Sequence, residues 1–148
     1  MDRHVIVIDD SAVVRSLLTT ALSHHGYTVS GFSDGLQALH ALLSPHAEHV
    51  IPVCVIVDIG LPGMDGSQVL RALRKCPAYA HTTFVVLTGR DSALERLCMR
   101  IAGASEYLTK PFTIQQVLAA LRAEQADTPS AACKEEAASG LPLRRVQY

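Results

Sequence analysis

With 148 residues, the chain can form one domain with a full hydrophobic core, whereas two domains would be cramped. It carries 13 basic and 14 acidic residues, so it lacks the basic excess that nucleic-acid binding requires. No apolar run approaches the ~20 residues of a membrane span, and the opening M-D-R-H does not resemble a secretory signal. The four cysteines lack metal-binding spacing, which favours reduced thiols in a cytoplasmic protein. From the charge balance and the short apolar runs we expect no binding to nucleic acid or to membranes.

Short apolar runs alternate with amphipathic segments over residues 1–123. The predicted strands are 4–8, 27–32, 53–58, 83–88 and 106–108, and the predicted helices are 14–24, 36–43, 67–75, 91–102 and 114–123. The run that ends in Asp58 is apolar at every earlier position, as expected of a central strand covered by helices on both faces. Leu17 is placed on the apolar stripe of the first helix. This alternation predicts an α/β domain with a doubly wound, five-stranded parallel sheet and five helices.

The segment 124–148 has no sustained apolar face and is too short to build a second core. We therefore expect one domain over residues 1–123, followed by a C-terminal tail without a second domain. The tail is either flexible or docks on the domain or on a neighbour through Leu141, Leu143 and Val146.

Polar residues stand at the ends of four predicted strands. Asp9 and Asp10 follow the first strand, Asp58 ends the third, Thr88 ends the fourth, and Lys110 follows the fifth. In a parallel sheet these ends lie at one edge, where open α/β sheets bind their ligands. Three carboxylates at one edge repel each other unless a cation neutralises them. Hard oxygen ligands without neighbouring His or Cys pairs favour Mg²⁺.

A carboxylate beside Mg²⁺ is a competent nucleophile toward phosphorus. The metal, the Lys110 ammonium and the Thr88 hydroxyl can each neutralise or hydrogen-bond one oxygen of a transferring phosphoryl group. Each residue alone has an ordinary explanation: Asp10 as a helix cap, Thr88 as a cap, Lys110 as a solvated lysine. Together they indicate phosphoryl chemistry at Asp58. Asp65 and the glycine after it are interpreted as an ordinary turn.

The set Asp9-Asp10, Asp58 followed by L-P-G-M-D-G, Thr88-Gly89 and Lys110-Pro111-Phe112 closely resembles the receiver domains of response regulators in two-component signalling. The resemblance covers residues 3 to about 123. It implies a flavodoxin-like sheet of strand order 2-1-3-4-5, with Asp58 as the phospho-acceptor. It also implies that Asp9, Asp10, Asp58 and the backbone carbonyl of Gly60 hold Mg²⁺.

The resemblance further implies that Thr88 is the switch hydroxyl and Lys110 the lysine that contacts the phosphoryl group. Tyr107 stands at the family's switch aromatic, which turns inward when Thr88 is drawn to the phosphoryl group; the alternative is plain packing beside a short strand. The Lys110–Pro111 bond is expected to be cis. Gly60 offers no side chain to shield an acyl phosphate, and Arg90 is long and cationic, so both residues are expected to alter its lifetime.

Because we see no output domain after residue 123, we expect either a stand-alone receiver, which is favoured, or a fragment of something larger. The resemblance implies that the chain receives its phosphoryl group from a sensor histidine kinase or a histidine phosphotransfer protein. Catalysis would be confined to Mg²⁺-dependent self-phosphorylation and self-dephosphorylation. The face formed by the fourth helix, fifth strand and fifth helix would bind a downstream protein or a second copy of the chain. One alternative is a receiver-fold docking module that works without phosphorylation. A haloacid-dehalogenase-type phosphatase is disfavoured because its second aspartate is replaced by Gly60.

Overall fold

The structure is a computed structural model that describes residues 3–45 and 51–127, the side chains of 124–127 excepted. The predicted tail contacts through Leu141, Leu143 and Val146 lie outside the described residues. None of the helices in the described ranges is long and apolar enough to cross a membrane.

Five strands alternate with five α-helices, as predicted. The strands are β1 (His4–Ile8), β2 (Thr28–Phe32), β3 (Cys54–Asp58), β4 (Thr83–Thr88) and β5 (Glu106–Thr109). The helices are α1 (Ala12–His24), α2 (Gly35–Leu43), α3 (Gly66–Arg74), α4 (Ala93–Ala102) and α5 (Ile114–Asp127), with a short 3₁₀ helix η1 (Pro77–Tyr79) before β4. All strand pairs are parallel and the sheet order is β2-β1-β3-β4-β5, which confirms the predicted flavodoxin-like topology.

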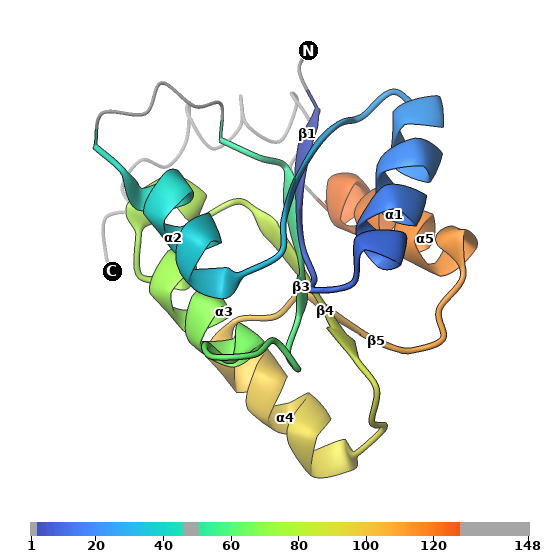
Figure 1. Cartoon of the computed structure of the whole chain (residues 1–148). Coiled ribbons are helices and arrows are strands. Elements are labelled where there is room, and N and C mark those ends of the chain that lie inside the picture. The colour runs from blue at the N-terminus through green and yellow to red at the C-terminus, as the bar shows by residue number, and fades with distance from the viewer. Residues whose placement is uncertain (1–2, 46–50, 128–148) are drawn as a thin grey trace, which may run out of the picture.

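Helices cover both faces of the sheet: α1 and α5 lie on one face, and α2, α3 and α4 lie on the other (Figure 1). Alternate residues of the central strand β3 enter two separate cores, because successive side chains of a strand point to opposite faces. Val55 and Val57 pack with the α2–α3–α4 layer, whereas Cys54 and Ile56 pack with the α1–α5 layer. Every residue of β3 is buried, which explains its uninterrupted apolar sequence.

Several local features differ from the sequence-based expectation. Leu17 is 49% exposed, because α1 buries Leu18 and Leu22, one turn apart, and Leu17 is rotated about 100° away from Leu18. The helix α4 begins at Ala93, since Ser92 serves as its N-cap, and α5 continues past the predicted end to Asp127. The 3₁₀ helix that buries Tyr79 was not predicted.

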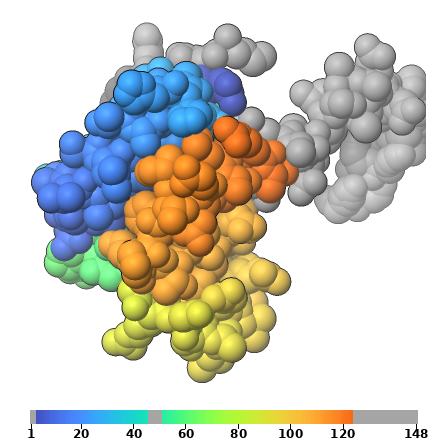
Figure 2. All heavy atoms as spheres, turned by 90° about the vertical axis from the view of Figure 1, so that its right-hand side faces the viewer, coloured from blue at the N-terminus to red at the C-terminus, as the bar shows by residue number. Residues whose placement is uncertain are grey.

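The parallel register aligns the carboxyl ends of the strands. Asp58 pairs with Leu87, and Thr88 pairs with Thr109, the residue before Lys110. Figure 2 shows the face of the molecule that α1 and α5 cover, with α4 below α5. The strand ends that carry the predicted site residues therefore lie along one side of the molecule.

Candidate functional site

The carboxylates of Asp9, Asp10 and Asp58 form a cluster at this edge, with one ligand oxygen of each lying within 4.8 Å of the others. Asp9 is fully buried and Asp58 is 6% exposed, whereas Asp10 is open to solvent. The sequence-based prediction that these three acids meet is therefore confirmed. Their mutual repulsion in a partly buried site must be offset by positive charge.

Lys110 supplies one such charge. Its Nζ donates to Oδ2 of Asp9 at 3.0 Å and to Oδ2 of Asp58 at 3.1 Å. Burial by itself would lower the pKa of Lys110, but the hydrogen bonds and charges of Asp9 and Asp58 outweigh it, so the pKa is raised above its ordinary value. Lys110 is therefore a cation at neutral pH. The Lys110–Pro111 peptide bond is cis, as expected.

One ammonium does not balance three carboxylates, and the remaining oxygens suit a hard divalent cation. Asp9 Oδ1 accepts the backbone N–H of Ser11 at 2.9 Å, and Asp58 Oδ1 accepts that of Gly60 at 2.9 Å. The Asp10 carboxylate, by contrast, makes no hydrogen bond or ion pair with any residue of the described ranges. An exposed carboxylate without such a bond, beside two buried carboxylates, suits an ion such as Mg²⁺ that keeps several of its water ligands.

Two glycines of the loop after β3 lie against Asp58. A Cβ at Gly60 would stand 3.5 Å from Asp58 Oδ1, so a side chain there would cover the carboxylate. A Cβ at Gly66 would come within 2.3 Å of the Asp58 carbonyl oxygen and 2.6 Å of the Ile59 Cα. The interpretation of Asp65 and Gly66 as an ordinary turn was therefore incomplete: Gly66 lets the first turn of α3 pack directly on the backbone of Asp58.

Asp65 also has a definite role, because it caps α3. Its side chain accepts the backbone N–H of Ser67, and the Gln68 side chain accepts the backbone N–H of Asp65, which completes a capping box. The loop that follows Asp58 is thus fixed at both ends, by the sheet on one side and by α3 on the other.

The predicted switch residues lie on the β4–β5 side of the cluster. The Thr88 hydroxyl donates to Oε1 of Glu95 at 3.3 Å and accepts the backbone N–H of Arg90 at 3.0 Å. The Tyr107 hydroxyl is placed to donate to the same Glu95 oxygen at 2.9 Å and to the Arg90 carbonyl at 3.1 Å. Within the described part of the chain, Thr88 makes no hydrogen bond to Asp58. The structure thus joins Thr88 to Tyr107 through Glu95, a residue that the sequence-based prediction did not include.

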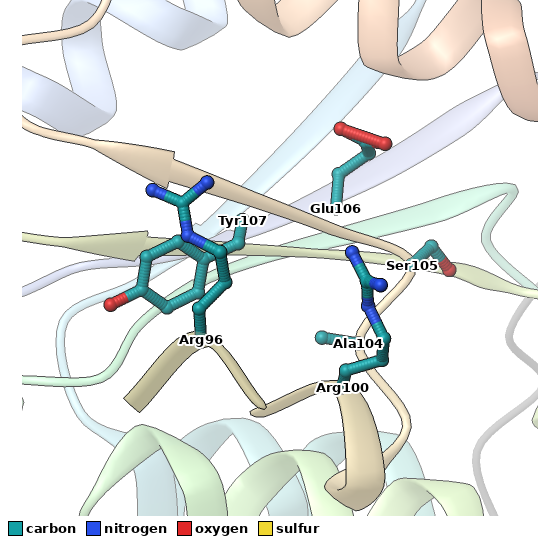
Figure 3. Close-up of a pocket in the computed structure, with 6 residues that line it drawn as sticks. All are labelled: Arg96, Arg100, Ala104, Ser105, Glu106 and Tyr107. Carbon is teal, nitrogen blue, oxygen red and sulfur yellow. The ribbon is translucent and has the colours of Figure 1, made fainter. Parts of the chain in front are cut away.

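Tyr107 also forms one wall of a small pocket between α4 and β5, which is lined by Arg96, Arg100, Ala104, Ser105, Glu106 and Tyr107 (Figure 3). The Arg96 guanidinium lies over the Tyr107 ring, 5.0 Å from its centroid. Tyr107 is half-buried, so its ring contributes to the surface of the molecule while its hydroxyl contacts Glu95 and Arg90.

Comparisons with known proteins agree with this geometry. A family model for the response regulator receiver domain matches residues 5–122. Response regulator MprA of Mycobacterium ulcerans is 38% identical over 123 residues, which are 83% of this chain and 50% of that relative. MprA of Mycobacterium bovis is 35% identical over 144 residues, which are 97% of this chain and 58% of the relative. The chemotaxis response regulator CheY4 of Vibrio cholerae has a TM-score of 0.75 at 27% identity, over 84% of this chain and 99% of that structure.

The fold and the acidic site define a receiver module of two-component signalling, and the chain belongs to the response regulator receiver domain family. It spans between 50% and 58% of the length of the MprA relatives named above.

Proposed function

We propose that Asp58 accepts a phosphoryl group and that its charge changes the surface formed by α4, β5 and α5. The observation that carries this proposal is the setting of Asp58, a nearly buried carboxylate that touches Lys110 and lies beside Asp9 and Asp10. A carboxylate that served only to support the fold would not need two further acids within 4.8 Å. Membership of the receiver family supports the same role.

The donor we propose is a phosphohistidine, on a sensor histidine kinase or a histidine phosphotransfer protein. An oxygen of Asp58 attacks the phosphorus; the O–P bond forms while the N–P bond breaks, and the donor nitrogen keeps the electron pair and takes up a proton. Lys110 already touches Asp58 Oδ2, so its ammonium is in place to neutralise an oxygen of the incoming group. Attack by water on phosphorus later releases phosphate and restores the carboxylate.

Asp9, Asp10, Asp58 and the carbonyl of Gly60 would hold Mg²⁺ in this proposal. The ion, when bound, neutralises the carboxylates and withdraws charge from the phosphoryl oxygens. The Asp10 carboxylate is exposed and makes no hydrogen bond within the described residues, so the ion would first meet the site there. Asp9 positions Lys110 and the backbone of Ser11.

The partner-binding side of the proposal rests on Thr88 and Tyr107. Thr88 would donate to a phosphoryl oxygen, and Tyr107 would respond at the pocket between α4 and β5. A downstream protein or a second copy of the chain would then bind this surface with a different affinity. The division into a receiver domain of residues 1–123 and a tail of residues 124–148, and the stand-alone mode of action, remain predictions.

Intact-mass spectrometry after incubation with Mg²⁺ and phosphoramidate or acetyl phosphate tests the proposal. We expect a phosphate-sized gain that disappears in Asp58→Asn and when EDTA removes Mg²⁺. Asp65→Asn is the matched control, because Asp65 is an acid of the same loop that contacts α3 instead of the cluster; it should be modified like the wild type. No gain with any donor, or an equal gain in Asp58→Asn, would favour the docking module that works without phosphorylation.

A further inference from the structure

One carboxylate oxygen, Oε1 of Glu95, accepts hydrogen bonds from both proposed switch residues. Thr88 reaches it from the end of β4 at 3.3 Å, and Tyr107 reaches it from β5 at 2.9 Å. Glu95 lies in the first turn of α4, where its backbone N–H donates to the Ser92 side chain. In a capping box the Glu95 side chain would return to the Ser92 backbone, but here it faces the two hydroxyl groups. Glu95 thus has contacts beyond those that capping requires.

Thr88 has a single hydroxyl proton, and in this structure Glu95 accepts it. The Thr88 oxygen already accepts the backbone N–H of Arg90 at 3.0 Å, so this bond orients the hydroxyl group. A phosphoryl group on Asp58 offers acceptor oxygens and no donor at neutral pH, so it can bond Thr88 only by taking the same proton. Glu95 and the phosphoryl group therefore compete for the hydrogen bond that the Thr88 hydroxyl can donate.

We propose that Glu95 is a positioning residue that competes with a phosphoryl group on Asp58 for the Thr88 hydroxyl and transmits the outcome to Tyr107. This inference rests on the proposed function of Asp58 as the acceptor. Before phosphorylation, Oε1 of Glu95 is shared by two donors. After Thr88 turns to the phosphoryl group, Tyr107 has this oxygen to itself, and its hydroxyl is held more firmly against α4. The Glu95 carboxylate thereby opposes the movement of Thr88 toward the phosphoryl group. Once Thr88 has moved, the same carboxylate stabilises the position of the Tyr107 hydroxyl against α4.

The titration of Tyr107 reports on this contact independently of phosphorylation. Burial raises the pKa of Tyr107, and the hydrogen bond and charge of Glu95 raise it further. The neighbouring Thr88 hydroxyl group and the charge of Arg96 lower this pKa but do not cancel the rise. Because the phenolate would lie beside the Glu95 carboxylate, loss of that charge must make the Tyr107 proton easier to remove.

The first test measures the affinity of the Mg²⁺-loaded protein for beryllium trifluoride, a stand-in for a phosphoryl group on a carboxylate. Glu95→Gln keeps the shape but weakens a charge-assisted bond to a neutral one, so we expect binding about fivefold tighter than wild type. Glu106→Gln is the matched control: it removes an exposed acid one residue before Tyr107 that lines the pocket without bonding either hydroxyl. Its affinity should equal that of the wild type. In a Thr88→Val background, Glu95→Gln should have no effect.

The second test needs no metal or phosphoryl mimic. Nuclear magnetic resonance of ¹³C-labelled tyrosine, with the Tyr107 signal assigned by Tyr107→Phe, should show a lower Tyr107 pKa in Glu95→Gln and an unchanged one in Glu106→Gln. If Glu95→Gln is poorly folded, Glu95→Ala is the second variant. We expect it, too, to bind beryllium trifluoride more tightly and to lower the pKa of Tyr107.

The outcomes separate the inference from the function on which it rests. If wild type binds beryllium trifluoride but Glu95→Gln binds it no more tightly than Glu106→Gln, the inference is wrong and the proposed function stands. An unchanged Tyr107 pKa in Glu95→Gln would likewise overturn the link to Tyr107. If wild type neither binds beryllium trifluoride nor takes up a phosphoryl group, the proposed function fails and the inference fails with it.

Discussion

The neighbouring helices α3 and α4 cover the same face of the sheet (Figure 1). The side chains of α3 are buried far more deeply than those of α4. Three apolar side chains of α3, Val69, Leu70 and Leu73, are fully buried. In α4, Met99 alone among the large side chains is buried, while Leu94, Leu97 and Ile101 are 71%, 54% and 77% exposed. Apolar burial is the main stabilising term that attaches a helix to a sheet, so α3 is anchored and α4 is lightly held.

The polar contacts follow the same division. The first turn of α3 packs on the Asp58 backbone at Gly66, where no side chain would fit, and Asp58 is held by Lys110 and the Gly60 N–H. Among the described residues, the first turn of α4 meets the site through the hydroxyl groups that converge on Glu95. A change at Asp58 is therefore most easily accommodated by α4, because few buried contacts must be broken there.

Leu70→Ala should lower the free energy of unfolding by about 2–5 kcal/mol, because it leaves a cavity in the core under α3. Leu97→Ala makes the same chemical change on α4 and should stay within about 0.5 kcal/mol of the wild type. Urea denaturation followed by circular dichroism measures both. Similar losses in the two variants would show that α4 is as firmly anchored as α3.

Gly66→Ala should destabilise the protein by about 1–3 kcal/mol, since its Cβ would collide with the Asp58 carbonyl and the chain must shift. Gly60→Ala is the matched variant, because its Cβ would meet Asp58 Oδ1 at an ordinary contact distance of 3.5 Å. We expect Gly60→Ala to be close to neutral in stability and to affect the lifetime of the acyl phosphate instead. A neutral Gly66→Ala would mean that α3 is not fixed to the acceptor loop.

Lys110→Met should lower stability by about 1–3 kcal/mol at pH 7 without Mg²⁺, because it leaves the repulsion between Asp9 and Asp58 uncompensated. Lys75→Met removes an exposed lysine at the end of α3 and is the control. The pKa of Lys110 is raised in the folded state, so its stabilisation is complete below the ordinary lysine pKa of about 10.4 and is lost as pH rises through the higher folded value. Denaturation at a series of alkaline pH values should therefore bring wild type and Lys110→Met together.

Much of the fold and of the acidic site could be predicted from the sequence. The uninterrupted apolar run before Asp58 indicated a central strand, and the positions of Asp9, Asp10, Asp58 and Lys110 at strand ends placed them at one edge. These features follow from short-range periodicity and from the geometry of parallel sheets.

Glu95 and Gly66 could not be assigned in the same way, because their contacts depend on how loops bring distant segments together. The sequence Ser92-Ala-Leu-Glu95 is a capping-box pattern, and nothing in it shows that the Glu95 carboxylate faces Thr88 and Tyr107. Gly66 follows an aspartate, as in many turns, and its close approach to Asp58 appears only in three dimensions. Leu17 was misplaced because a helix with apolar residues at adjacent positions cannot bury all of them.

The smallest predicted effects concern the two N-caps, and they distinguish anchoring from local helix stability. Asp65→Ala removes the cap of α3 and should cost about 1 kcal/mol in global stability, because α3 unfolds with the rest of the domain. Ser92→Ala removes the corresponding cap of α4, but a lightly held helix can fray without unfolding the core. We therefore expect a smaller global loss, about 0.5 kcal/mol, with faster amide hydrogen exchange confined to the first turns of α4. Exchange that accelerated evenly over the whole domain in Ser92→Ala would show that α4 and the core unfold as one unit, and α4 would then be a poor candidate for the element that responds to Asp58.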